Sequence, residues 1–489
     1  MAKSQNISQS NLKAEVNLPQ FIKQVGIIAI PVALQNLLTT TGTMVDTIMI
    51  APLGEISVGA VGLCSQYATL MIACYWGFVG GGMLFFSQYW GAKDHKNIAR
   101  SFGLTLVCML TVSFIFGGVA IFSPWTIMRL YTDKLAIQEI GVQYLTVIGL
   151  AYPLQIIAVA MSTVLRATER VKIPLFAAIC SVLSNIFLNW VLIGGHLGCP
   201  ALGVRGAALA TVCASLVNVI VIIILAACVK YPYLFMFKEF FNWKKDHLSL
   251  FFQKSFPIIL SEVFIGVGNL VINAVLGRQS EQAIAALAVF RTFEGLIIGF
   301  FQGFANASSV LVGKCVGSGE LSLAYERAKR LIPLCQFSVL IMAILVNILK
   351  PYAFVIMGLS GQSFDICSSL ILMYTIVAVI RMGNWAMNDT FRASGDSFTG
   401  TVLEISFMYL MVLPCVCLAG LKFKASILIV FPLCYCDEII RYVLMMLQLI
   451  SGRWIKPVTP EGLAQLDGFR SLLKKPEKKP QNKPKKKEA

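Results

Sequence analysis

Charged residues are scarce in this chain. Only 13% of its 489 residues are Asp, Glu, Lys or Arg, whereas 57% are hydrophobic. A water-soluble globule of this size needs more polar side chains to cover its surface, so the composition excludes a soluble domain. The mean hydropathy of +0.76 agrees with this exclusion. The sequence therefore predicts a protein that lies within a lipid bilayer.

Histidine is nearly absent, and cysteine follows no ligand pattern. The three histidines, His95, His196 and His247, all fall in predicted loops. The fourteen cysteines include no CxxC pair, and most lie in apolar runs, where small hydrophobic side chains are common. The spans thus offer neither a set of zinc ligands nor a nucleophile with its base. We expect no structural metal, no cofactor and no enzymatic activity.

Apolar runs long enough to cross a bilayer recur along the chain up to about residue 451. A spanning helix needs about 20 mostly apolar residues. The first run is longer than a signal-peptide core, so we expect it to be a span rather than a cleaved leader. The pattern predicts an all-α integral membrane protein with twelve spans, near 24–50, 57–90, 99–123, 139–165, 172–194, 203–229, 250–276, 283–312, 328–349, 366–393, 399–420 and 424–450.

The two halves of the chain resemble each other at an offset of 226 residues. The most informative matches are Pro31 with Pro257, Gly91 with Gly317, and Arg166 in "TVLRATER" with Arg392 in "DTFRASGD". Such residues mark kinks, tight turns and helix ends, and we expect the two arginines to hold the cytoplasmic ends of spans four and ten. Because six spans return the chain to its starting side, the repeat predicts two six-helix lobes related by a pseudo-two-fold axis along the membrane normal.

Polar segments divide the chain into five predicted regions. A cytoplasmic N-terminal tail covers 1–23, an N-lobe 24–229, a cytoplasmic linker 230–249, a C-lobe 250–450 and a basic disordered tail 451–489. The last 16 residues, "KKPEKKPQNKPKKKEA", contain almost only Lys, Pro and other polar residues and cannot form a core. Lys and Arg are concentrated in the predicted inner segments, which places both termini in the cytoplasm. This distribution explains the net charge of +16, so the charge does not indicate a nucleic-acid partner. We expect the protein to lie in the plasma membrane.

Polar side chains inside the N-lobe spans form one candidate site. An ionised residue at mid-membrane costs about 2.5–3.5 kcal/mol on insertion scales, so each one calls for an explanation. Asp46 follows Pro31 by 15 residues, or about 22 Å of helix, which puts it in the outer half. Asn185 and Asn189 share a helix face, and Thr211 reaches a similar depth. We expect a polar pocket there, although asparagines can also simply join helices.

The C-lobe carries a different set of charges. Glu262 lies in mid-span, and its partner in the repeat is Asn36, whereas the partner of Asp46 is Ile272. The lobes have therefore diverged in where they keep an acid, which favours unequal roles.

Other C-lobe charges have the spacing of structural ion pairs. Arg291 and Glu294 are three residues apart, and Asp437 and Arg441 four apart, so each pair can meet on one helix face. Asp389 is close enough to a predicted helix end to be solvated.

Several motifs together resemble the multidrug and toxic compound extrusion (MATE) transporters of the bacterial type. They are "PVALQNLLTTTGTMVDTIMI" in the first span, "SQYWGAKD" after the second, "LRATER" after the fourth, NxxxN in the fifth and "FRASGDS" after the tenth. The resemblance implies two lobes that form an outward-opening V. It also implies a kink proline at Pro31, a coupling acid at Asp46, ion-site groups at Asn185, Asn189 and Thr211, and a seventh-helix acid at Glu262.

The resemblance implies an antiporter that exports organic cations or other amphipathic xenobiotics in exchange for Na⁺ or H⁺. Some members have an aspartate where this chain has Asn189, which leaves the coupling ion open. We expect a monomer whose partners are a small cationic or amphipathic substrate and the bilayer, with no nucleic acid. The alternative is a flippase for lipid-linked oligosaccharides or another lipid. A flippase of this kind would need a basic cavity for pyrophosphate, and the charges within these spans are mixed.

Overall fold

The computed structural model describes residues 17–356 and 361–473, and the regular structure in this part of the chain is helical. The first half contains α1 (Leu18–Ile50), η2 (Ala51–Leu53), α2 (Glu55–Gly91), α3 (His95–Phe122), α4 (Pro124–Tyr131), α5 (Leu135–Ile148), α6 (Ala151–Ala167), α7 (Lys172–Gly194) and α8 (Val204–Cys228). A short connection contains η3 (Pro232–Leu234) and α9 (Phe237–Phe240). The second half contains α10 (Lys245–Leu276), α11 (Glu281–Gly317), α12 (Leu321–Ile356), α13 (Gly361–Ala393), α14 (Thr399–Phe407), η4 (Met408–Val412), α15 (Leu413–Cys417), η5 (Leu418–Lys422), α16 (Ile427–Leu433), α17 (Glu438–Ser451) and α18 (Pro460–Leu473).

The apolar runs become long helices, as their length requires. Within the described residues, ten helical stretches are long and apolar enough to cross a bilayer. The pair α5 and α6, bent by 49° at its break, makes an eleventh. The twelfth predicted run, 424–450, is divided into α16 and α17, with Pro432 near the break. Each piece alone is too short to span, which is why the length test does not count it.

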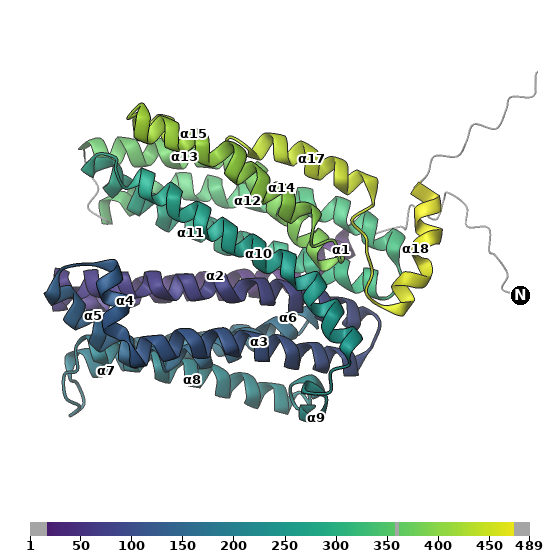
Figure 1. The fold of residues 1–489 in the computed structure, drawn as a ribbon, viewed down its shortest axis with the longest axis horizontal. Helices are drawn as coiled ribbons and strands as arrows, with labels where there is room; N and C mark the ends of the chain where they lie inside the picture. The colour runs from purple at the N-terminus through teal and green to yellow at the C-terminus, as the bar shows by residue number, and fades with distance from the viewer. Residues whose placement is uncertain (1–16, 357–360, 474–489) are drawn as a thin grey trace, which may run out of the picture.

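The helices form two groups that the repeat relates to each other. In Figure 1 the first-half helices α2, α3, α7 and α8 and the teal-to-yellow helices of the second half lie close together at the right and diverge toward the left. Helix α1 packs against α11, and α2 packs against α10. The 226-residue offset equates α1 with α10 and α2 with α11, so it exchanges these two contacts. This exchange is what a pseudo-two-fold axis between the halves produces.

Two glycines allow the central helices to cross closely. A Cβ on Gly91 of α2 would collide with the Lys314 carbonyl of α11, and a Cβ on Gly317 would collide with the Gln88 carbonyl. Gln88 and Lys314 are themselves partners in the repeat, so the crossing lies beside the axis. We call the end of the bundle at Gly91 and Gly317 the closed end.

The C-terminal segment 452–473 is folded against the closed end. Trp454 is fully buried and stacks on Phe391, with ring centroids 5.4 Å apart. The Val458 N–H donates to Gln88 Oε1 at 2.8 Å, and α18 follows. The prediction that disorder begins at residue 451 is therefore wrong for this segment, because its apolar residues find a site on the helix ends. Residues 1–16 and 474–489, the outer parts of the predicted tails, lie outside the described residues.

The predicted linker is also folded. Tyr231, Tyr233 and Phe240 are buried, and the hydroxyls of Tyr231 and Thr168 hydrogen-bond at 2.7 Å. Helix α10 begins at Lys245, inside the predicted 230–249 region. Aromatic residues scattered through a polar stretch, rather than an apolar run, form these contacts.

Replacing Trp454 with Phe tests whether the C-terminal segment belongs to the fold. The indole Nε1 donates to the Leu449 carbonyl at 3.0 Å, and losing one such bond costs about 1 kcal/mol. We expect trypsin to cleave between residues 453 and 470 roughly fivefold faster in the variant. Trp125, 40% exposed and without an indole hydrogen bond to any described residue, provides the control Trp125→Phe. Equal cleavage of the variant and the parent would contradict the expectation.

Candidate ion site and substrate cavity

The four polar residues predicted for the N-lobe lie together. Asp46 Oδ1 on α1 accepts a hydrogen bond from Asn189 Nδ2 on α7 at 2.6 Å. Asn189 Nδ2 also donates to Asn185 Oδ1 at 3.1 Å, and Asn185 Nδ2 reaches Thr211 Oγ1 on α8 at 3.5 Å. Because Asn185 and Asn189 are one helical turn apart, both amides face α1 and α8. The four residues thus form one cluster on three helices, as the sequence predicts, and their role as an ion site stays a prediction.

This N-lobe site presents carboxylate, amide and hydroxyl oxygens. Within the described residues, no Lys or Arg forms an ion pair with Asp46, which is half-buried. The Asn189 Oδ1 atom is buried without a hydrogen-bond partner there. A carboxylate beside amide and hydroxyl oxygens suits a hard cation, and the carboxylate alone suits a proton. The arrangement can therefore accept either candidate coupling ion.

Pro31 lies inside α1, as Pro257 lies inside α10. A proline lacks the N–H that would bond to the carbonyl four residues earlier, so each helix has a weakened turn at the same point of the repeat. The helix assignment of α1 continues from Leu18 to Ile50 through this turn. The role of Pro31 as a moving kink stays a prediction.

Glu262 has a different environment from Asp46. Arg392 Nη1 donates to Glu262 Oε1 at 2.9 Å, and Arg392 Nη2 lies 3.8 Å from Glu404 Oε2. The Arg392 side chain is only 11% exposed. The expectation that Arg392 simply holds a helix end is therefore incomplete, because its charge is turned inward to an acid on another helix. The role of Glu262 in coupling stays a prediction, and this acid already has a cationic partner.

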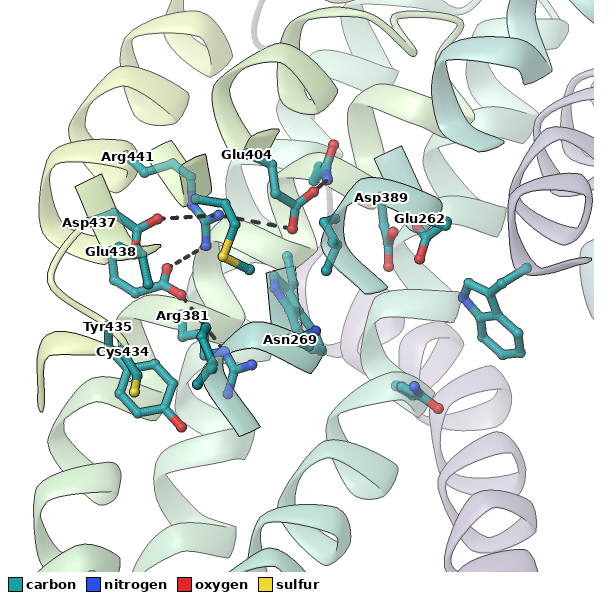
Figure 2. A pocket seen from close by; sticks show the side chains of 18 of the residues that line it. Glu262, Asn269, Arg381, Asp389, Glu404, Cys434, Tyr435, Asp437, Glu438 and Arg441 are labelled. Carbon is teal, nitrogen blue, oxygen red and sulfur yellow. Dashed lines mark hydrogen bonds and ion pairs between the residues drawn. The ribbon is translucent and has the colours of Figure 1, made fainter. Parts of the chain in front are cut away.

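The other C-lobe charges form a buried network. Figure 2 shows Arg381, Glu404, Asp437, Glu438 and Arg441 around one pocket, with dashed lines between the paired groups. Arg441 lies 2.7 Å from Glu438 and 3.9 Å from Glu404. Burial of so many charges requires this pairing, since an isolated ion would cost several kcal/mol.

Both ion pairs predicted from spacing are confirmed. Arg291 Nη1 lies 2.6 Å from Glu294 Oε2, and Arg441 Nη1 lies 3.5 Å from Asp437 Oδ2. Sequence reasoning missed Glu438, which accepts from the Asn384 amide at 2.7 Å as well as from Arg441. The spacing of three residues between Glu438 and Arg441 was the available signal.

Two cavities adjoin these groups. A C-lobe cavity of about 340 Å³ is lined by the charged network of Figure 2. A second cavity, of about 460 Å³, is lined by residues of both halves, from α1, α2, α6, α11 and α13. We call it the central cavity. Asp389 and Arg392 line both cavities, so the two adjoin at α13. Asp389, predicted to be solvated at a helix end, instead faces these cavities.

Comparison with known proteins defines the class. The sequence model of the MatE family matches the chain twice, at residues 31–191 and 257–417. The two matches start 226 residues apart, the offset of the internal repeat. The chain belongs to the MatE family of multidrug efflux transporters, and the predicted all-helical, two-lobe class is confirmed.

Similar proteins agree with this assignment. The chain is 22% identical to the "Uncharacterized transporter YisQ" of Bacillus subtilis (strain 168), over 84% of this chain and 90% of YisQ. It is 22% identical to the "Multidrug resistance protein NorM" of Vibrio cholerae serotype O1, over 59% of this chain and 64% of NorM.

Solved structures share the fold. A crystal structure of MATE in complex with MaL6 superposes with a TM-score of 0.79 at 16% identity, covering 96% of this chain and all of the other. A MOP superfamily transporter from Pyrococcus furiosus Vc1 (DSM3638) superposes with a TM-score of 0.75 at 17% identity, covering 92% of this chain and 98% of the other. That structure is described with the words "Reverse polarity of binding pocket suggests different function".

Proposed function

We propose that this protein exports amphipathic organic compounds, including organic cations, in exchange for Na⁺ or H⁺. The observation that carries the proposal is Asp46, an acid among oxygen ligands on three helices, with no cationic partner in the described part of the chain. The other candidate coupling acid, Glu262, forms an ion pair with Arg392. Of these two acids, Asp46 is therefore the one that is free to exchange an ion.

The coupling rests on the position of Asp46 in α1. This helix also lines the central cavity through Gln35, Asn36, Thr39 and Thr40. An ion that binds Asp46 and draws in the Asn189 amide would alter how α1 packs against α7, and so the wall of the cavity. Ion binding and substrate binding then change each other's affinity through one helix, which is the thermodynamic requirement for exchange.

The proposal includes the orientation of the protein. We place the closed end, with its basic neighbours Lys93, Arg170 and Lys314, at the cytoplasmic face, because basic residues are enriched there. Both termini then lie in the cytoplasm, and the halves diverge toward the outside. We propose a monomer in the plasma membrane, because each chain contains both halves of the central cavity.

Replacing Asp46 with Asn is expected to abolish gradient-driven export. Exchange of one ion for one cationic dye moves no net charge, so the ion's own concentration gradient drives export. A roughly 50-fold gradient of Na⁺ or H⁺, worth about 2.3 kcal/mol, could sustain roughly a 50-fold dye gradient. Without the carboxylate this coupling is lost, and the accumulated gradient of a cationic dye should fall to near one. The measurement is dye uptake or efflux in liposomes under separately imposed Na⁺ and H⁺ gradients, which also identifies the ion.

Asp133→Asn is the matched control. It makes the same change of charge as Asp46→Asn, but at a residue that is exposed in the loop between α4 and α5. It should transport like the parent. If Asp46→Asn sustains the same dye gradient as the parent, the proposed coupling is wrong.

A further inference from the structure

Arg166 and Arg392 occupy the same position in the repeat but have different surroundings. Arg392 is paired with Glu262 at 2.9 Å and lies near Glu404 at 3.8 Å. In the first half, Asn36 stands at the position of Glu262, and Ala178 at that of Glu404. The two halves therefore share the arginine but differ at both positions that hold acids around it in the second half.

Asn36 does not compensate the charge of Arg166. Its Nδ2 donates to the Gly299 carbonyl and to Gln302 Oε1, both at 3.3 Å and both on α11. Arg166 Nε donates to the Ser162 carbonyl of its own helix at 3.3 Å. Within residues 17–356 and 361–473, Arg166 forms no ion pair. Its guanidinium therefore has donors that no described residue uses.

Arg166 lines the central cavity, where a substrate is expected to bind. Thr163 and Asn306 line the same cavity, and the Oδ1 atom of Asn306 is buried without a partner among the described residues. Asp389 lines it as well and forms no ion pair with Arg166. The cavity thus presents an uncompensated cation and, separately, oxygen atoms that accept hydrogen bonds.

A guanidinium keeps its charge at every accessible pH and binds carboxylate or phosphate through two parallel hydrogen bonds. We propose that Arg166 binds an oxyanion of the transported molecule, so that the preferred substrates are amphipathic zwitterions or anions rather than simple organic cations. An ammonium group on the same molecule would face the Asp389 carboxylate and the side-chain amide oxygen of Asn306. This inference rests on the proposed transport through the central cavity and specifies its substrate class.

A pair of dyes that differ only in the anion tests the inference. One is a rhodamine with a free carboxylate, and the other is its methyl ester, which has lost the oxyanion and kept the cationic ring system. Binding of each to the purified full chain in nanodiscs is measured by fluorescence anisotropy. We expect the carboxylate dye to bind about tenfold tighter, and Arg166→Gln to bring the two affinities within about twofold of each other.

Matched variants keep the test decisive. Arg166→Lys retains the charge and should preserve most of the preference, while Arg170→Gln, at an exposed position four residues away, should preserve all of it. The inference is overturned if Arg166→Gln weakens both dyes equally, which would indicate a structural role. It is also overturned if the parent binds the ester as tightly as the acid.

Competition identifies the source of the oxyanion. Octanoate supplies a carboxylate, and a lysophosphatidate supplies a lipid phosphate, so the stronger competitor against the carboxylate dye names the class. Equal failure of both to compete overturns the subsite. Binding requires no ion gradient, so this result is independent of the export assay. A parent protein that shows no dye preference refutes the subsite alone, and efflux that does not depend on an ion gradient refutes the coupling alone.

Discussion

Replacing Arg392 with glutamine is expected to destabilise the protein by about 3–5 kcal/mol, because it leaves buried acids without their cation. Glu262 loses its only ion-pair partner among the described residues, and Glu404 loses one of two. The side chains of Glu262 and Glu404 are 20% and 12% exposed, so water compensates only in part. The measurement is thermal unfolding in detergent, followed by tryptophan fluorescence.

The repeat provides an internal control for this prediction. Arg166→Gln makes the same substitution at the equivalent position, where no carboxylate depends on the arginine, and should change stability by less than about 1 kcal/mol. The double variant Arg392→Gln with Glu262→Gln should recover part of the loss, since it removes both members of the pair. Equal destabilisation by Arg392→Gln and Arg166→Gln would contradict the ion-pair explanation.

Replacing Gly91 with valine is expected to separate the two halves at the closed end. The added Cβ would collide with the Lys314 carbonyl, which belongs to the backbone of a long helix and cannot rotate away. Overpacking against side chains typically costs 1–3 kcal/mol, and against backbone we expect about 3 kcal/mol or more. Thermal unfolding measures the loss, and export assays should show reduced transport.

Gly62→Val in the same helix is the control, because a Cβ at Gly62 meets nothing within 4 Å. Both substitutions replace a glycine of α2 with the same β-branched residue, so they differ mainly in what the added side chain meets. Gly317→Val should reproduce the effect of Gly91→Val from the other side of the axis, against the Gln88 carbonyl. A stable Gly91→Val protein with full transport would contradict this prediction, because it would show that α2 and α11 can cross at a wider spacing.

The N-lobe site was predictable because its signals are local. The spacing of Asn185 and Asn189 fixes a shared helix face, and the depth of Asp46 follows from its distance along α1 from Pro31. Periodicity alone was enough to place these groups at one level. These groups come into contact because α1, α7 and α8 pack side by side.

The C-lobe network was only partly predictable. Pairs such as Arg291 with Glu294 lie on one helix and follow from spacing, but Glu262 and Arg392 are 130 residues apart. Their meeting depends on how α10 and α13 pack, which no local pattern encodes. The fold of the C-terminal segment was not predicted for the same reason. Trp454 is buried by distant helix ends rather than by an apolar run of its own.

The C-terminal segment bonds to both halves at the closed end, through Gln88 of α2 and Gly317 of α11, and Gln88 also bonds to α13. Gln88 Nε2 donates to the Ala393 carbonyl, Gln88 Oε1 accepts from Val458, and Thr459 Oγ1 donates to the Gly317 carbonyl, at 2.8–2.9 Å. If transport requires the closed end to open, these three bonds must break, each worth about 1 kcal/mol. Three such bonds correspond to a factor of about 100 in the equilibrium constant in favour of the conformation described here. In the proposed exchange, a bound ion or substrate would have to favour the other conformation by at least that factor.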